Sequence, residues 1–71
     1  MTRDQIGHIF AQFADLAAGK PFEVAARVND RSYIGPCRPD FAHELLCFYE
    51  NGLAYVPFAA VLSLFCKGPL P

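Results

Sequence analysis

The sequence predicts a mainly β protein with one N-terminal helix, in which five short strands close into a small barrel. Three observations support this prediction. Apolar residues first recur at helical spacing, up to Gly19 and Pro21. Five short apolar or alternating segments, separated by turn residues, then follow within fifty residues. One of these segments has a glycine in its middle, where a small barrel must bend its strand sharply.

The helix is expected over residues 3–18. Thr2 and Gln5 have the spacing of a capping box, in which the two side chains bond backbone amides at the helix start. Gly19 suits the C′ position that follows a helix, and Pro21 cannot continue one. The apolar residues share a single face; they are Ile6, Ile9, Phe10, Phe13, Leu16 and Ala17.

The first two strands are expected on either side of a turn at Asn29-Asp30. Alternate residues from Phe22 to Val28 are apolar, which is typical of a strand with one buried face. The second strand covers residues 31–38. Gly35-Pro36 interrupts it with a bend, and Pro39-Asp40 ends it.

The last three strands follow in quick succession. A third strand is expected over residues 44–50, and Asn51-Gly52 predicts a hairpin that leads to a fourth strand over residues 53–56. Pro57 stops the fourth strand, and a short turn leads to a fifth strand over residues 61–65. We expect one domain spanning residues 1–66, followed by an irregular tail over residues 67–71.

The composition predicts self-association. Of the 71 residues, 54% are hydrophobic, which is more apolar surface than a monomer of this size can bury. The fifth strand is apolar on both faces, and an edge strand of this kind must be paired or covered. We therefore expect an oligomer interface there, formed by Val61, Leu62, Leu64 and Phe65.

Charge and cysteine usage limit the function classes. Six Lys and Arg residues against seven Asp and Glu residues give a net charge of −1, without the basic excess that most nucleic-acid binders show. The three cysteines fit no zinc motif and predict a reducing, cytoplasmic compartment, with no metal. The longest uncharged run is too short and too interrupted to cross a membrane.

Five segments together carry a family resemblance; they are Gly19–Val24, Asn29–Gly35, Asp40, Leu45-Leu46 and Val56–Leu64. Over about residues 3–66, this pattern resembles the Sm-like family, and within it the bacterial host-factor (Hfq-type) branch. The resemblance implies a five-stranded Sm-like or SH3-like small barrel.

The resemblance implies a homo-oligomeric ring, in which the fourth strand of one subunit pairs with the fifth strand of the next. It also implies RNA or oligonucleotide binding at the pore. Phe58-Ala59 stands where the host-factor branch carries Lys-His. An alternative is therefore a protein-binding regulator or inhibitor of a larger machine, such as the transcription apparatus. A third is a small-ligand binder at subunit clefts.

The candidate binding residues flank the expected loop at Pro39-Asp40. Arg38, Phe41 and His43 supply a cation, an aromatic ring and a histidine, which suit a phosphate and a stacked base. The competing interpretation is that Phe41 belongs to the core and the other two are solvated. For a protein partner, Phe58 is the expected contact.

No catalytic or cofactor motif is evident, so an enzyme is not expected. The sequence has no glycine-rich phosphate loop and no carboxylate pair in apolar surroundings. A nucleophile and base formed by Cys37 or Cys47 with His43 is a weaker alternative.

Overall fold

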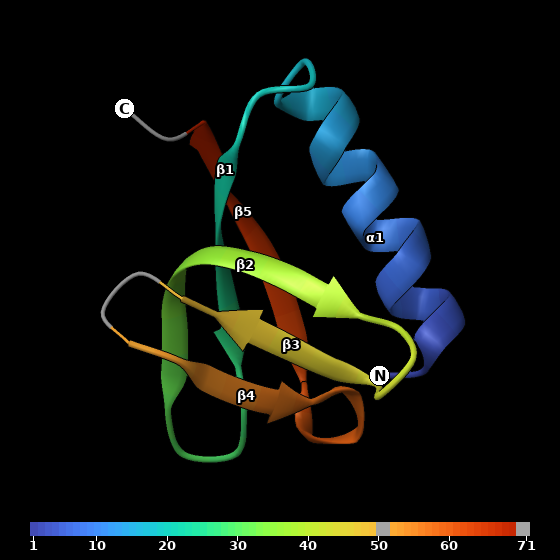
Figure 1. The fold of residues 1–71 in the computed structure, drawn as a ribbon, viewed down its shortest axis with the longest axis vertical. Coiled ribbons are helices and arrows are strands. Elements are labelled where there is room, and N and C mark those ends of the chain that lie inside the picture. The colour runs from blue at the N-terminus through green and yellow to red at the C-terminus, as the bar shows by residue number, and fades with distance from the viewer. Residues whose placement is uncertain (50–51, 70–71) are drawn as a thin grey trace.

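The computed structural model describes residues 1–49 and 52–69, as one helix and a five-stranded antiparallel sheet (Figure 1). The strand order is β4-β3-β2-β1-β5. The mainly β class with one N-terminal helix is therefore confirmed. The elements are α1 (Arg3–Leu16), β1 (Phe22–Arg27), β2 (Ser32–Asp40), β3 (Leu45–Phe48), β4 (Ala54–Pro57), the short 3-10 helix η1 (Phe58–Ala60) and β5 (Ser63–Pro69).

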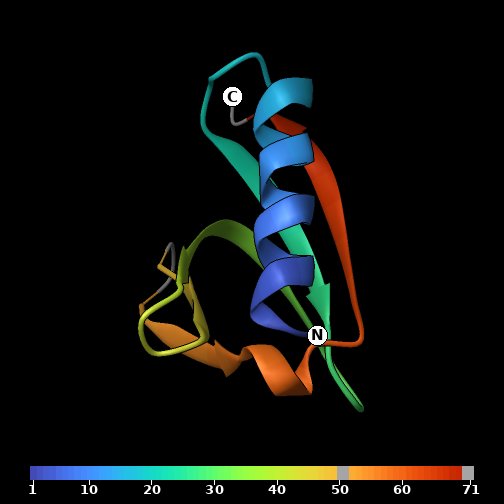
Figure 2. The ribbon, with the colours of Figure 1, turned by 90° about the vertical axis from the view of Figure 1, so that its right-hand side faces the viewer.

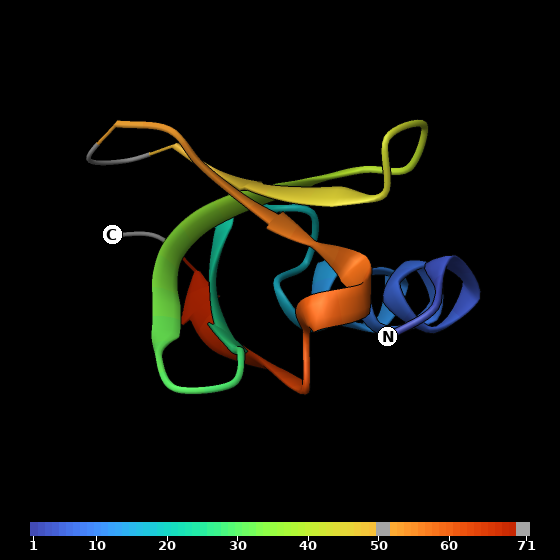
Figure 3. The same cartoon turned by 90° about the horizontal axis from the view of Figure 1, so that it is seen from below.

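The sheet is not closed, so the predicted closed barrel is wrong. β4 and β5 are the two edges, and they do not pair with each other among the described residues. The strands curve around a common interior, and η1 joins the two edges (Figure 3). β4 is only four residues long, and the 3-10 turn that follows it redirects the chain before a ladder with β5 can form.

The capping box is confirmed, but the helix is shorter than predicted. Thr2 Oγ1 accepts a hydrogen bond from the Gln5 amide at 3.2 Å, and Gln5 Oε1 accepts one from the Thr2 amide at 2.9 Å. The helix ends at Leu16 because the left-handed backbone begins at Ala18, with φ +54°, one residue before Gly19. Ala18 therefore occupies the C′ position that we expected for Gly19.

β2 is one strand with two partners. Its residues 32–36 pair with β1, and its residues 37–40 pair with β3. Gly35 has φ +146°, a conformation that residues with a side chain rarely adopt. The expectation that this glycine marks a bend is confirmed.

The strand does not end at Pro39-Asp40, as the sequence predicted. Pro39 pairs with Leu46, and Asp40 pairs with Leu45. A proline removes one ladder donor, which is tolerated where one side of the strand has no partner. Pro39 has no β1 neighbour and Pro36 has no β3 neighbour, so neither interrupts a two-sided ladder.

β5 starts two residues later and ends four residues later than predicted. Its pairing runs along all of β1, from Arg27↔Ser63 to Phe22↔Pro69, with a bulge at Glu23/Val24. The expected irregular tail is therefore wrong for residues 67–69, because β1 supplies a partner that far. Residues 70 and 71 lie outside the described chain.

The ends of the β3–β4 hairpin also shift. β3 falls inside the predicted range, and β4 lies one residue later than expected. Asn51 of the predicted Asn51-Gly52 turn lies outside the described residues, as does residue 50. Gly52 itself has φ +105°, in the region that favours glycine.

The core lies between α1 and the concave side of the bent sheet. In Figure 2, α1 lies across β1 and β5. Phe10, Phe13 and Phe22 pack together, with ring centroids 5.8–6.3 Å apart, where the helix meets the start of β1. The most deeply buried side chains come from the helix, the sheet and η1; the largest are Phe58, Ile6, Leu46 and Val24.

The positive φ at Gly35 leads to a stability prediction. We expect Gly35→Ala to lower the free energy of unfolding by about 1–3 kcal/mol, because alanine must adopt a strained backbone there. Gly7→Ala is the matched control. A Cβ at Gly7 would lie an ordinary 3.7 Å from Phe41 Cε1, and alanine favours a helix interior by up to about 1 kcal/mol. Urea denaturation measures both, and equal effects would show that β2 is not constrained at this bend.

Candidate functional site

The three predicted binding residues do not form one cluster. The guanidinium carbon of Arg38 lies 5.6 Å from the ring centroid of Tyr49. Phe41 packs edge-on against Phe58, with centroids 5.7 Å apart, and keeps 38% of its surface exposed. His43 contacts Asp40. Each residue has a different neighbour, and Phe41 contacts the core through Phe58.

The loop after β2 is held by its own side chains. Asp40 Oδ1 accepts a hydrogen bond from the His43 amide at 3.1 Å, and Asp40 Oδ2 lies 2.9 Å from His43 Nδ1. The side-chain and backbone hydrogen bonds from His43 hold the pKa of the Asp40 carboxyl below its usual value. Glu44, which ends the loop with φ +54°, forms an exposed ion pair with Arg3. Both the backbone amide and the ring of His43 therefore contact Asp40 within the loop.

Two of the predicted surface residues are buried. Phe58 is only 1% exposed, because η1 turns its ring into the core, so it cannot be the expected protein contact. Val61 is also buried, at the end of the same turn, and cannot form an oligomer interface as expected. Leu64 is half-buried and packs against the core, whereas Leu62 and Phe65 are exposed.

Arg38 instead lines a hollow together with Lys20 and Tyr49. The hollow lies where the chain leaves α1 and passes the β2–β3 ladder. Among the described residues its walls are Gly19, Lys20, Pro21, Phe22, Cys37, Arg38 and Tyr49, none of which is acidic. The hollow thus combines two permanent positive charges with an exposed aromatic face.

Sequence reasoning missed Lys20 and Tyr49. The local pattern marks Lys20 only as the end of the helix, and Tyr49 only as part of an apolar strand. Arg38 pairs with Cys47, and paired residues project to the same face of the sheet. Side chains two residues apart in a strand also share a face, so Tyr49 lies on the same face as Arg38. This register could have indicated the contact, but the sequence did not predict that β2 continues to Asp40.

The chemistry of this hollow suits an anionic ligand with a flat ring. A guanidinium over a tyrosine leaves the ring able to stack and the cation able to reach a phosphate. The Lys20 ammonium is a second, more flexible phosphate donor.

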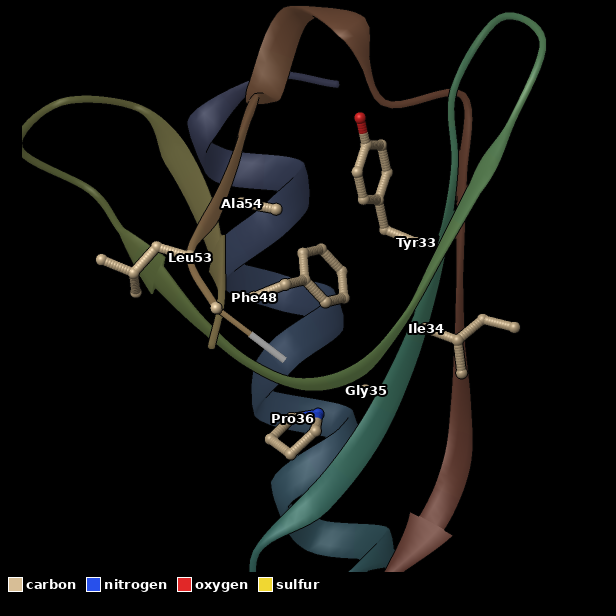
Figure 4. Close-up of a pocket in the computed structure, with 8 residues that line it drawn as sticks. Tyr33, Ile34, Gly35, Pro36, Phe48, Leu53 and Ala54 are labelled. Atoms are coloured by element: carbon tan, nitrogen blue, oxygen red, sulfur yellow. The ribbon is translucent and has the colours of Figure 1, made fainter. Parts of the chain in front are cut away.

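A second hollow lies inside the bend of β2. Figure 4 shows Tyr33 and Phe48 facing one another across it, while the Ile34 side chain points away. The two ring centroids are 5.8 Å apart, at an interplanar angle of 30°. Pro36 and Ala54 also border this hollow, which is mainly a gap between aromatic core residues.

The cysteines carry no evident chemistry. Burial, with a smaller effect from nearby Cys47, raises the pKa of the Cys37 thiol to about 12. The thiol is therefore protonated at neutral pH and is a poor nucleophile. The ring of His43, the base in the weaker alternative above, contacts the carboxylate of Asp40. Across residues 1–49 and 52–69, no three His, Cys, Asp or Glu side chains group as metal ligands.

No helix in the described part of the chain is both long and apolar enough to cross a membrane. The chain matches no protein-family model, no curated protein and no solved structure.

Burial predicts an order of thiol reactivity. In the folded protein at pH 8, we expect iodoacetamide to modify Cys47 and Cys66, which are half-buried, much faster than Cys37. Unfolding in urea should make the three rates similar. Peptide mass spectrometry after timed quenching measures each site. Rapid modification of Cys37 before unfolding would contradict the burial described above.

Proposed function

We propose that this protein is a non-enzymatic Sm-like binding module that assembles from copies of itself and binds single-stranded RNA or a related oligonucleotide. The observation that carries the proposal is the hollow of Lys20, Arg38 and Tyr49, which brings two cations and an aromatic ring together. A cytoplasmic location, suggested by the three free cysteines, is part of the same proposal.

Each part of the hollow has a role in this proposal. The exposed ring of Tyr49 accepts a base by stacking, which is tolerant of sequence. Arg38 and Lys20 bind the adjacent phosphates. The net charge of −1 does not oppose this binding, because the steering field depends on where charges lie, and none of the described lining residues of this hollow is acidic.

The open edges of the sheet support assembly. The Sm-like resemblance implies pairing between the fourth strand of one subunit and the fifth of the next. In this fold, β4 and β5 are the two sheet edges, so both have backbone groups available for a neighbour. Leu62 is 61% exposed immediately before β5, close to that edge.

A protein-binding regulator is the second candidate. The observation that favours it is the number of large apolar side chains exposed on or next to the strands, among them Ile34, Leu53, Tyr55 and Phe65. Such residues are typical of protein contacts. Salt dependence separates the two candidates, because phosphate contacts weaken steeply with added salt and apolar contacts do not.

The RNA proposal predicts distinct effects for three variants. With fluorescent single-stranded oligonucleotides at about 50 mM salt, where phosphate contacts are least screened, Tyr49→Ala should cost about 1–3 kcal/mol of binding free energy. Arg38→Ala and Lys20→Ala should each reduce the slope of log K against log salt by about one.

Arg31→Ala is the matched control, because Arg31 is an equally exposed cation in the β1–β2 turn, away from the hollow. We expect it to leave the affinity unchanged. Absence of binding by the unaltered protein, or equal loss in all four variants, would reject the hollow as the RNA site.

The assembly proposal predicts dissociation by a charge at the edge. Leu62→Asp should shift light-scattering mass to a smaller species, because it places a carboxylate where the neighbouring edge strand packs. Leu16→Asp is the control, since Leu16 is also exposed but lies at the end of α1. A folded monomer of unaltered sequence at micromolar concentration would contradict assembly.

A further inference from the structure

One row of side chains on the outer face of the sheet is both apolar and exposed. Ala25 in β1 pairs with Ile34 in β2 on one side and with Phe65 in β5 on the other. Residues directly opposite in a sheet project to the same face. Ile34 is 61% exposed and Phe65 is 60% exposed, with the small Ala25 between them. The three form a continuous apolar row across three strands, which we name the outer row.

This row lies on the side of the sheet away from the core. Val24 and Ala26, the neighbours of Ala25 in β1, are buried, so Ala25 must project outward. α1 covers the opposite side of β1 and β5 (Figure 2). Figure 4 also shows the Ile34 side chain directed away from the interior. No described part of the chain covers the outer row.

Within β1, the outer row is flanked by one charge of each sign. Arg27 follows Ala25 by two residues, and Glu23 precedes it by two, so both project to the same outer face, each about 7 Å from the row. Their cross-strand neighbours are uncharged: Ser32 and Ser63 beside Arg27, and Pro36 and Gly68 beside Glu23. Neither charge has an ion-pair partner within the described residues.

We propose that this face packs against the same face of a second copy of the chain, related by a two-fold axis that runs along the outer row. A two-fold contact must be self-complementary. Rotation about the row places Arg27 of one copy opposite Glu23 of the other, twice in each dimer. The same rotation brings Phe65 to Phe65 and Ile34 to Ile34.

The side-chain sizes fit such a contact. Packed sheets usually cross at about 30° and lie about 10 Å apart. At this angle the two Phe65 rings are offset, which is the arrangement that aromatic pairs prefer. Ala25 leaves space at the centre, into which the flanking Ile34 and Phe65 side chains can lean. Lys67 is exposed, and the bulge leaves it without a partner in β1. Its long aliphatic stem lets the ammonium group reach water at the rim of the contact.

The charge pattern favours a second copy over other occupants. A nucleic acid would meet Glu23 as well as Arg27, and the carboxylate would repel its phosphates. A contact with itself pairs Arg27 of each copy with Glu23 of the other. It also leaves the edges of β4 and β5 unused, so it is independent of the edge assembly proposed above.

The test exchanges the two charges. Arg27→Glu places a second carboxylate opposite Glu23 of the other copy, and Glu23→Arg places two guanidinium groups opposite each other. Each variant alone should raise the Kd of self-association by about tenfold or more. An equimolar mixture of the two variants should restore association as heterodimers, because every facing pair is then opposite in sign. Native mass spectrometry distinguishes heterodimers from either homodimer by mass.

Two controls separate this contact from the edge contact. The whole series is repeated in a Leu62→Asp background, in which only the face contact should remain. Arg3→Glu changes the net charge by the same amount as Arg27→Glu but lies on α1, and it should leave the Kd unchanged. Phe65→Ser should weaken association in every background, including the mixture.

The expected result is loss in each single variant and recovery in the mixture. The proposal is overturned if either variant associates as the unaltered protein does, or if the mixture fails to recover. It is also overturned if the Leu62→Asp protein is monomeric at several hundred micromolar. If Phe65→Ser instead abolishes binding of the fluorescent oligonucleotide while self-association is unchanged, the face is an RNA surface and not a contact between copies.

Discussion

The bend of β2 at Gly35-Pro36 is the constraint on which the rest of this fold depends. A single strand leaves one antiparallel ladder and enters another, so five short strands curve around one core without closing. Gly35 can adopt φ +146°. Of the two prolines in β2, Pro36 pairs only with β1 and Pro39 pairs only with β3. A proline in a strand that is paired on both sides would break one of its two ladders.

The same bend determines which surfaces are available for binding. The half of β2 beyond it carries Arg38 to the face of Tyr49, beside the end of α1. The half before it carries Ile34 to the outer face, beside β1. The basic hollow and the apolar row therefore lie on different parts of one strand, and their chemistry is different. One is suited to a phosphate and a base, and the other to a matching protein face.

Local signals in the sequence predicted the order and number of the elements, but not the contacts between them. The capping box, the alternation in β1 and the bend at Gly35 all depend on neighbouring residues and were predicted correctly. β5 extends to Pro69 only because β1 supplies a distant partner, which no local pattern reveals. Phe58 is buried because η1 folds inward, and Phe41 packs against its ring from the loop after β2, so neither contact could be predicted from composition. The missing part of the candidate site, Lys20 and Tyr49, joins segments far apart in the chain.

The strand order also has a consequence for how the chain folds. β1, β2, β3 and β4 are neighbours in both sequence and space, and each new strand closes only a short loop. The β1–β5 ladder is the exception, since Phe22 must meet Pro69. Closing that long loop costs the most chain entropy, and contacts of this kind slow folding. The β1–β4 meander can therefore form first, and the ladder that displays Phe65 beside Ala25 is completed last.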